Sequence, residues 1–419
     1  MSNGISKTDL NLIPAGYKQT EVGVIPEDWD VIQLGDCASY VGSGKTNTKS
    51  RGEYPLYGST GLIGSCELPE YSGESLLVAR VGANAGRLNY VYGEYGVSDN
   101  TILIKIKPTN NISFFKYWLI RKNLNTLVFG SGQPLITGTQ LKELYLPLPS
   151  NTEQTTIANA LSDVDLLISE LDKLIAKKQA IKTATMQQLL TGRTRLPQFA
   201  LHEDGSKKST KQSELGEIPE DWEKFTFDEV ISFCSSGATP YRGNKSFYKG
   251  TIRWITSGEL NYCTIYDTIE KISDDAVLKA NLKIHPAGTF LMAITGLEAA
   301  GTRGACGITG QPSATNQSCM AIYPNEKLIT PYLYFWYTYN GEDLAFKYCQ
   351  GTKQLSYTAG LIKKIPLYLP VDIKEQTAIA TILSDMDEEI QALKQRLSKT
   401  RQIKQGMMQE LLTGKTRLI

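Results

Sequence analysis

The segment GSGKT at residues 42–46 has the ending of a phosphate-binding P-loop, in which backbone N–H groups cradle phosphates and the lysine reaches them. The complete pattern needs a further glycine five positions before the glycine of the Gly-Lys pair, and Ser39 occupies that position. A second Gly-Lys-Thr at residues 414–416 fails in the same way, because Gln409 stands where the glycine is needed. Neither place is therefore expected to bind a nucleotide.

Other residues that could carry chemistry also lack the partners which that chemistry needs. Enzymes that methylate a base flip it out of the helix, and the Asn/Asp-Pro-Pro-aromatic motif of amino-methyltransferases is absent, since the chain has no Pro-Pro pair. The segment FGSG at residues 129–132 resembles a cofactor loop but leads into no strand–helix unit of the Rossmann type. Asp163 and Asp165, like Asp385 and Asp387, lie on predicted helices, where solvated or partner-facing carboxylates are favoured over a metal site.

The composition fits a reduced, metal-free protein of more than one domain. A chain of 419 residues exceeds one typical core, and its 41% hydrophobic and 21% charged residues are ordinary for a globular protein. The 7 cysteines show no Cys-x-x-Cys spacing, and His202 and His285 are the only histidines. No apolar run is long enough to cross a bilayer, so we expect a cytoplasmic protein with no membrane partner. With so little catalytic equipment, we expect no enzymatic activity and no cofactor in this chain.

Polar and basic side chains gather instead in glycine-containing loops that follow predicted strands, and such side chains on a rigid scaffold can read base edges or contact phosphates. In the first half the candidates for contact with DNA are Lys45, Lys49, Arg51, Tyr57, Ser59, Thr60, Arg80, Asn84 and Arg87. In the second half they are Thr239, Tyr241, Arg242, Lys245, Ser257, Arg303, Gln317, Lys353 and Gln354. For each residue alone, a solvated surface group or a turn-stabilising group is an equal alternative, so the prediction concerns the sets.

The elements that must position these loops are short strands. The runs LLVARV, TILIKI, TIRWIT and TFLMAI are rich in β-branched residues and are bounded by glycine, serine or proline. One or two helices accompany them in each half, around Trp118 and Trp336. We therefore predict the α+β class, with two domains that are mostly strand.

A long segment that occurs twice predicts two amphipathic helices. Residues 153–196 return as residues 375–418, and about half of the paired positions are identical, as expected of an internal repeat. Apolar residues in each copy alternate spacings of four and three, which is the pattern of a coiled-coil seam. Such a narrow seam needs a partner helix, and the other copy is the obvious one. The seam residues are Ile157, Leu161, Val164, Ile168, Leu171 and Ile175, and Ile379, Leu383, Met386, Ile390, Leu393 and Leu397.

The duplication extends to the domains. KQTEVGVIPEDW at residues 18–29 returns as KQSELGEIPEDW at residues 211–222, and DNTILIKIKP at residues 99–108 is aligned with TNQSCMAIYP at residues 315–324. The predicted order is a lead-in (1–16), a first domain (17–150), a central helix (151–196), a linker (197–213), a second domain (214–371) and a second helix (372–419). If the helices pair antiparallel, a pseudo-two-fold axis relates the two halves.

In these motifs the chain resembles the DNA-specificity subunits of type I restriction-modification systems. The motifs that support this resemblance are the two IPEDW segments that open the domains, the SGATP loop at residues 236–240, and the duplicated EQ-x-x-I-A-x-x-L-S-D-x-D and LLTG-R/K-TRL segments. The resemblance implies two pseudo-symmetric target-recognition domains, each reading half of a bipartite asymmetric site in double-stranded DNA, joined by two long antiparallel, coiled-coil-like helices that set the spacer. It also implies two modification (methyltransferase) subunits as partners, with S-adenosylmethionine bound there, and restriction subunits in the full complex. The first domain departs from the pattern, since no Thr-Pro follows Ser43 and Gly44.

Three alternatives remain open from the residues alone. An orphan or regulatory subunit of this kind would bind the modification subunit without productive DNA reading. A coiled-coil assembly scaffold would carry protein-binding domains, and salt-insensitive interactions would favour it. An enzyme with an unrecognised site is disfavoured by the missing motifs and the scarcity of histidine.

Overall fold

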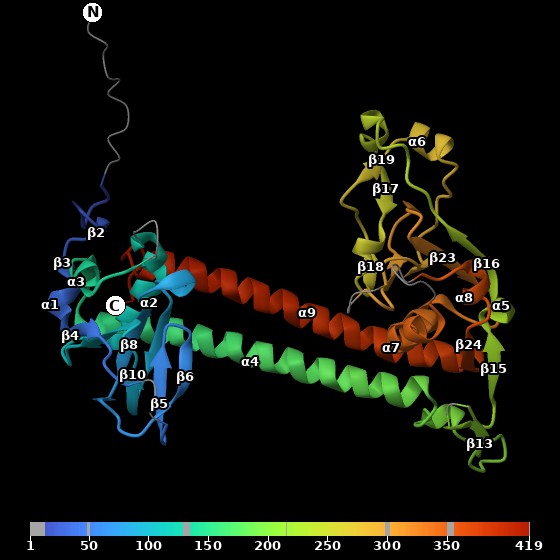
Figure 1. Cartoon of the computed structure of the whole chain (residues 1–419), viewed down its shortest axis with the longest axis horizontal. Coiled ribbons are helices and arrows are strands. Elements are labelled where there is room, and N and C mark those ends of the chain that lie inside the picture. Colours follow the sequence, from blue (N-terminus) through green and yellow to red (C-terminus); the bar gives the residue numbers. More distant parts are fainter. Residues whose placement is uncertain are drawn as a thin grey trace, which may run out of the picture. The chain divides into compact units, whose positions relative to one another are not determined.

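The computed structural model describes residues 13–47, 51–128, 135–214, 216–297, 302–349 and 356–418. The chain divides into two compact units, which we treat separately: unit 1 comprises Met1–Lys173 and Lys394–Ile419, and unit 2 comprises Leu174–Leu393. Each unit contains one domain of mixed strands and helices, together with half of each of two long helices (Figure 1). Within the described residues, no helix is both apolar and long enough to span a membrane.

Unit 1 is built on an antiparallel sheet with the strand order β4-β11-β8-β9. Its strands are β4 (Ala38–Ser43), β8 (Ser75–Ala79), β9 (Leu88–Val91) and β11 (Thr101–Ile106). A second sheet, in the order β6-β5-β10-β7, consists of β5 (Tyr54–Gly58), β6 (Gly61–Cys66), β7 (Tyr71–Ser72) and β10 (Glu94–Val97). Two further antiparallel pairs join β1 (Tyr17–Thr20) to β2 (Gly23–Pro26) and β3 (Asp30–Gln33) to β12 (Tyr145–Leu148). The α-helices of the domain are α1 (Leu34–Cys37), α2 (Ile112–Lys122) and α3 (Gly138–Lys142).

Strand β8 is buried on both faces, which explains its continuous apolar sequence. Leu76 and Val78 pack in the cluster that contains the aromatic residues of α2, whereas Leu77, between them, packs with Tyr95 and Val97 of the second sheet. This alternation follows from the two-residue period of side chains along a strand. The loops that leave β8 and its neighbours therefore start from a rigid support.

Unit 2 repeats this plan on a larger scale. Its main sheet has the order β16-β23-β20-β21-β18, from β16 (Ile231–Ser236), β18 (Cys263–Ile265), β20 (Phe290–Ala293), β21 (Cys306–Thr309) and β23 (Cys319–Pro324). A smaller sheet in the order β19-β17-β22 contains β17 (Ile252–Ile255), β19 (Lys271–Ile272) and β22 (Ser313–Thr315). The remaining pairs join β13 (Thr210–Ser213) to β14 (Gly216–Pro219) and β15 (Trp222–Thr226) to β24 (Pro366–Pro370).

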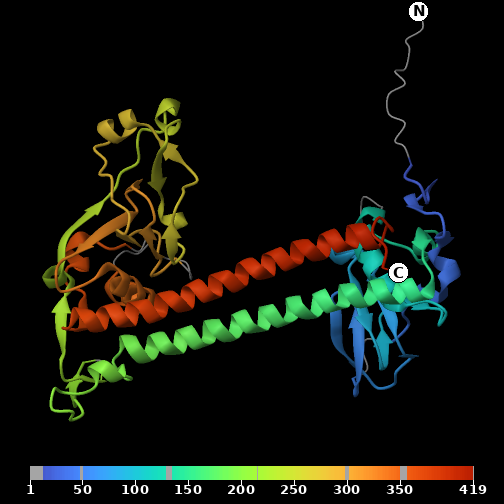
Figure 2. The same cartoon turned by 180° about the vertical axis from the view of Figure 1, so that it is seen from behind.

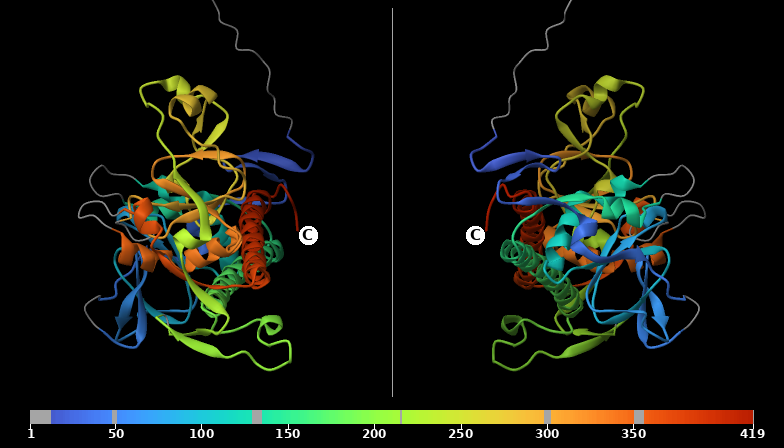
Figure 3. Two further views of the ribbon diagram at one scale, coloured as in Figure 1. Left: turned by 90° about the vertical axis from the view of Figure 1, so that its right-hand side faces the viewer. Right: turned by 90° about the vertical axis from the view of Figure 1, so that its left-hand side faces the viewer.

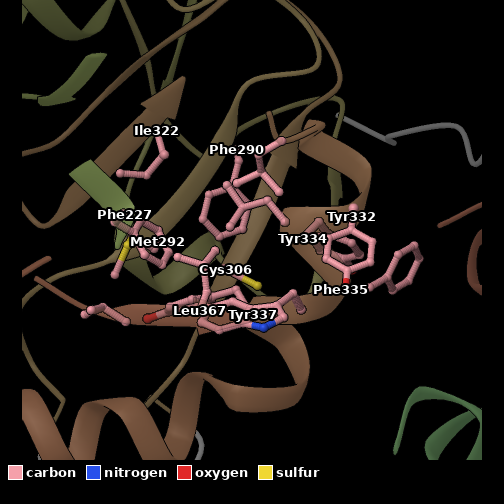
Figure 4. Packing of buried hydrophobic residues seen from close by; sticks show 14 of the residues in the cluster. Phe227, Phe290, Met292, Cys306, Ile322, Tyr332, Tyr334, Phe335, Tyr337 and Leu367 are labelled. Carbon is pink, nitrogen blue, oxygen red and sulfur yellow. The ribbon is translucent and has the colours of Figure 1, made fainter. Parts of the chain in front are cut away.

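Helix α7 (Thr330–Tyr348) covers the main sheet of unit 2 and supplies much of the core. Figure 4 shows Phe290 and Met292 of β20 and Ile322 of β23 in one cluster with the α7 residues Tyr334 and Tyr337, and the ring centres of Phe290 and Tyr337 lie 5.5 Å apart. The other helices are α5 (Phe227–Val230), α6 (Asp274–Lys279) and α8 (Ala359–Ile362). The second domain begins earlier than predicted, because β13 starts at Thr210, within the segment expected to be linker.

The strand register corrects the predicted alignment of the two halves. Thr101 of β11 pairs with Ala79 of β8, and the residue with the same role in unit 2 is Cys319, which pairs with Ala293 of β20. The sequence alignment placed Gln317 opposite Thr101, so it was wrong by two residues. The two strands share a dense apolar pattern but few identical residues, and the pairing of the strands, which sequence identity cannot report, determines the register.

The two long helices are α4 (Asn151–Leu190) and α9 (Ile373–Leu411), which have 40 and 39 residues. At 1.5 Å per residue each is about 60 Å long. In unit 1, Asp165 and Asp172 of α4 pair with Lys404 and Arg401 of α9, so the two halves run antiparallel. Figure 2 shows them from behind, and Figure 3 shows them close to end-on.

Unit 2 contains the matching pairs. Lys178 of α4 pairs with Glu389 of α9, and Lys182 pairs with Asp387, again in antiparallel order. All twelve residues of the predicted seam are buried or half-buried, and these are Ile157, Leu161, Val164, Ile168, Leu171, Ile175, Ile379, Leu383, Met386, Ile390, Leu393 and Leu397. In each unit the two helix halves are thus joined by ion pairs. That the seam residues of one helix contact those of the other stays a prediction.

Candidate nucleic-acid interface

Three loops of unit 1 meet at Arg80, the first residue after β8. The backbone N–H of Arg80 donates to the carbonyl of Asn100 over 2.9 Å, and its carbonyl accepts from the N–H of Ile136 over 2.9 Å. Its Nη1 lies 3.4 Å from Oγ of Ser43. Arg80 therefore links the loop after β4, the loop before β11 and the loop before α3, and its side chain is half-buried. A cation held in this way is positioned in advance to contact a base or a phosphate.

Gly44 allows the loop after β4 to lie close to its neighbours. A Cβ atom at this position would lie 2.2 Å from the carbonyl oxygen of Val97. The glycine at the same place in unit 2 is Gly237, where a Cβ atom would lie 1.8 Å from the carbonyl oxygen of Thr315. In both units a side chain is excluded, because no real Cβ approaches a backbone atom so closely. Gly44 and Gly237 therefore have the same structural role in the two units.

In unit 2 the corresponding loops are joined by the same backbone hydrogen bonds, which we call the loop frame, but their side chains differ. The N–H of Ile294 donates to the carbonyl of Ser318 over 2.9 Å, and the N–H of Tyr357 donates to the carbonyl of Ile294 over 2.8 Å. These bonds match those of Arg80, but the residue at the centre of the frame is a buried isoleucine. Nearby, the hydroxyl of Thr239 donates to Oε1 of Gln317 over 2.5 Å. The two units therefore share a support and present unlike polar groups.

Arg242 of unit 2 is engaged with a carboxylate. Its Nη1 and Nη2 lie 2.6 and 2.8 Å from the two carboxylate oxygens of Glu270, and this bond lowers the pKa of Glu270. The guanidinium also stacks over the rings of Tyr248 and Trp254, at 4.3 and 5.1 Å from their centres. This pair uses two of the five N–H donors of the guanidinium, so Glu270 fixes the direction of Arg242 without using all of its donors.

Arg303 also has protein partners. Its Nε donates to the carbonyl of Leu297 over 3.0 Å, and its guanidinium stacks on the exposed ring of Phe346 at 4.1 Å. Tyr57 of unit 1 packs edge-on against Tyr95, with ring centres 6.0 Å apart. These contacts give each residue a structural role beside any contact with DNA.

The remaining candidates differ in exposure. Exposed side chains are those of Lys45, Arg51, Thr60, Arg87, Tyr241, Lys245 and Gln317. Half-buried side chains are those of Ser59, Asn84 and Ser257. Lys49, Lys353 and Gln354 lie outside the described residues. The prediction that these residues contact DNA stays a prediction.

A cavity of about 360 Å³ in unit 1 adds residues that sequence reasoning missed. It is lined by Tyr40, Lys45, Glu70, Tyr71 and Lys105. The two ammonium groups suit the phosphate backbone of DNA, to which lysines bind by charge, and the carboxylate of Glu70 lies among them. The sequence held a signal for Lys105, since it lies between Ile104 and Ile106 and must face away from the core.

Within this cavity several groups hold one another in place. Nζ of Lys105 donates to the carbonyl of Ser72 over 2.9 Å, and Oγ1 of Thr46 donates to Oε2 of Glu70 over 2.9 Å. Burial raises the pKa of Tyr71, so its ring carries a neutral hydroxyl near neutral pH. Thr46 also accepts from the N–H of Val97 over 2.9 Å. The GSGKT segment thus ends a strand and enters an irregular loop, which is not the strand–loop–helix setting of a P-loop.

The D-x-D segments of the long helices contain four aspartates, Asp163, Asp165, Asp385 and Asp387, and none of them lies in a metal-binding cluster of described residues. Asp165 and Asp387 are paired with lysines. Within the described ranges, no three His, Cys, Asp or Glu side chains lie together in an arrangement that could hold a metal ion.

Comparison with known proteins agrees with this architecture. A family model described as "Type I restriction modification DNA specificity domain" matches residues 26–183 and again residues 219–402. The chain is 26% identical over 420 residues to the type I restriction enzyme MjaVIII specificity subunit of Methanocaldococcus jannaschii, covering 94% of each chain. It is 26% identical over 239 residues to the EcoDI specificity subunit of Escherichia coli, covering 52% of each.

A solved structure has the same fold. The crystal structure of the S subunit of a type I restriction-modification system from M. genitalium superposes with a TM-score of 0.62 at 16% identity, covering 91% of this chain and 96% of that one. The duplicated loop frame, carried by units that share two long helices, defines a pseudo-symmetric protein with two unlike recognition surfaces. The chain belongs to the type I restriction-modification DNA specificity family.

Proposed function

We propose that the chain is a non-catalytic subunit whose two units each read one half of a bipartite, asymmetric site in double-stranded DNA. The observation that carries this proposal is the repeated loop frame with a different residue at its centre. Arg80 and Ile294 accept and donate matching backbone bonds, yet one presents a cation and the other an apolar side chain. Two rigid frames with unlike side chains suit two different half-site sequences.

The expected protein partners follow from the repetition of the helix halves in the two units. Asp165 with Lys404 in unit 1 and Asp387 with Lys182 in unit 2 are matching features of the two helix halves. Two copies of one modification subunit would therefore meet similar surfaces, one in each unit. These subunits would bind S-adenosylmethionine and transfer its methyl group to adenine, and restriction subunits would join the full complex in the cytoplasm. The present chain would supply the choice of DNA sequence.

The test combines the chain with its cognate modification subunit and maps methylated adenines across a genome. We expect one bipartite sequence, with methylation lost when either component is left out. Methyl transfer by the purified chain alone would contradict the non-catalytic assignment. Methylation without any bipartite sequence would favour an orphan or regulatory subunit, and binding that does not weaken with salt would favour a protein scaffold, since DNA binding releases counterions.

A further inference from the structure

One arginine in unit 1 joins three segments that are remote in sequence. Nε and Nη2 of Arg417 lie 2.6 and 2.8 Å from the two carboxylate oxygens of Glu153, in the first turn of α4. Nη1 and Nη2 lie 2.9 and 2.8 Å from the carboxylate oxygens of Asp28, in the segment that opens the domain. The indole of Trp29 donates to the same Glu153 over 3.0 Å and is fully buried. We call this cluster of Arg417, Glu153, Asp28 and Trp29 the arginine clamp of unit 1.

Unit 2 repeats the arginine and the two carboxylates of this clamp, made by the other copy of each motif, but within the described residues its tryptophan, Trp222, makes no matching hydrogen bond through its indole. Nε and Nη2 of Arg195 lie 2.7 and 2.8 Å from the oxygens of Glu375, and Nη1 and Nη2 lie 2.8 and 3.2 Å from those of Asp221. Arg195 Nη2 also donates to the carbonyl of Phe199 over 2.9 Å, and Lys208 pairs with Asp221 at 2.7 Å. The clamp of unit 2 therefore has contacts beyond those of unit 1.

The clamps fix orientation as well as proximity. An arginine that binds two carboxylates through paired N–H groups restricts the angle between them, which a single contact does not. Behind each arginine a glycine with positive φ lets the turn lie against the domain: a Cβ atom at Gly414 would lie 2.4 Å from Cδ of Pro26, and one at Gly192 would lie 2.4 Å from Cδ of Pro219. The domain, one helix and the segment after the other helix are thus locked together in each unit.

Within the described residues, the hydrogen bonds of Arg417 go to Asp28 and Glu153, and neither residue belongs to a loop of the candidate interface. The partners of Arg417 are Asp28, Glu153 and the ring of Trp29, whose centre lies 5.7 Å from the guanidinium carbon. An effect of the clamp on DNA recognition must therefore act through the direction in which the domain leaves the helices.

We propose that each arginine clamp is a positioning device that sets the separation between half-sites which the subunit accepts. This inference rests on the proposed function, namely that each unit reads one half-site. The clamp holds a recognition domain at one angle to the helix pair, so only one spacer length brings both half-sites into register with both domains. One base pair more or less moves a half-site by about 3.4 Å and turns it by about 34°.

The experiment uses the full chain in complex with its modification subunits. Genome mapping with the wild type first establishes the two half-sites and the spacer; if no bipartite site emerges, the proposed function fails and the clamp is not at issue. Methylation rates are then measured on duplexes whose spacer is shorter or longer by one or two base pairs. For the wild type we expect roughly hundredfold discrimination against a change of one base pair, as for other small misplacements in positioned reactions.

The decisive variant is Asp28→Asn, because the Asp28 side chain is 65% exposed and the substitution preserves its shape. Arg417→Lys is the stronger variant, since lysine neutralises Glu153 but cannot bind both carboxylates through a planar fork. In both we expect the discrimination between spacers to fall about tenfold or more, with the half-site sequences unchanged. Asp221→Asn and Arg195→Lys should act in the same way from unit 2.

The matched control is Arg401→Lys. Arg401 is an exposed arginine of α9 in the same unit and pairs with Asp172, a residue of α4, so its loss affects no domain contact. We expect the spacer discrimination of this variant to equal that of the wild type. If Asp28→Asn retains full discrimination, the clamp does not position the domain. If the rates at all spacers fall in equal proportion with the melting temperature, the clamp serves stability alone, and the proposal is again wrong.

Discussion

The hydroxyl of Tyr117 in α2 donates a hydrogen bond to Oδ2 of Asp165 in α4 over 2.8 Å. The same aspartate pairs through Oδ1 with Lys404 of α9 at 2.5 Å, so one carboxylate joins the domain of unit 1 to both long helices. In unit 2, Lys182 pairs with Asp387 and lies over the ring of Phe335, which has no hydroxyl to donate. The domain of unit 1 is therefore tied to its helices by one hydrogen bond more at this position.

Replacing Tyr117 by phenylalanine should remove that bond and leave the ring in place. We expect a loss of about 1.5–3 kcal/mol in the free energy of unfolding, as for a hydrogen bond to a charged group. Urea unfolding of the full chain measures it. The reciprocal change, Phe335→Tyr, is the control, because it introduces a hydroxyl without removing one. An unchanged midpoint for Tyr117→Phe would show that Lys404 alone satisfies Asp165.

His285 makes the stability of unit 2 depend on pH. Burial lowers its pKa to about 4 from the ordinary value of 6.5, and its ring nitrogens lie 2.5 Å from the hydroxyl of Tyr323 and 3.3 Å from that of Thr315. Because the unfolded chain takes up the proton first as pH falls, the stability that depends on neutral His285 is complete above pH 6.5. It is lost progressively between pH 6.5 and 4, and amounts to at most about 3 kcal/mol.

The measurement compares melting temperatures of wild type and His285→Gln at pH 7 and pH 4.5. The wild type should lose more stability over this interval than the variant. The carboxylates whose pKa values lie below the ordinary value, such as that of Asp221, are the same in both proteins and affect them alike. Parallel curves for the two proteins would contradict the prediction.

Arg80 should determine one position of the half-site that unit 1 reads. If its guanidinium contacts a guanine, Arg80→Ala should cost about 1–3 kcal/mol of binding free energy and relax the preference at that position. The half-site read by unit 2 should not change. Competition binding with duplexes substituted one base at a time tests this, and a uniform loss across all sequences would assign Arg80 to a phosphate instead.

Lys45 and Lys105 should contribute through charge. Each substitution by alanine should weaken binding to all sequences alike and reduce the slope of log affinity against log salt by about one. The control is Lys18→Ala, since Nζ of Lys18 donates to the carbonyl of Glu27 in the opening hairpin. A salt slope equal to that of the wild type in both lysine variants would exclude the cavity from the interface.

The length of the paired helices should act as a ruler. Seven residues inserted into α4 between Ile175 and Ile181, and seven into α9 between Leu397 and Ile403, preserve the seam and lengthen each helix by about 10 Å. The spacer should grow by roughly three base pairs, with unchanged half-sites. Because three base pairs also rotate one half-site by roughly 100°, only an active variant is informative. Methylation at the original spacing by such a variant would show that the helices are not the ruler.

Much of this architecture could be predicted from local patterns. The spacing of Ile157, Leu161 and Leu171 indicated a helix with one apolar face, and these residues are buried. The repeated motifs indicated the pseudo-symmetry before any contact was known. The correspondence of β11 with β23 was missed by two residues, because strand register depends on pairing across the sheet.

The contacts of individual side chains could not be predicted in this way. The pairing of Arg242 with Glu270 and that of Arg417 with Asp28 join residues that only the tertiary fold brings together. Sequence reasoning placed Arg242 among the candidate DNA contacts, with a surface role as an equal alternative, and could not detect its partner carboxylate 28 positions away. It likewise gave no role to the arginines of the LLTG-R/K-TRL segments, whose partners come from the domain and the other helix.

The order of synthesis treats the two units differently. Arg195, Asp221 and Glu375 have all been made when the ribosome reaches the first turn of α9, so the clamp of unit 2 has all its members before that of unit 1. The carboxylate of Glu153 has no arginine partner until Arg417 is made, and the apolar cluster of unit 1 lacks Met408, Leu411 and Leu412 until the same stage. Domains generally fold from the N-terminus as they emerge. Here the domain that is made first is the last to receive all of its residues.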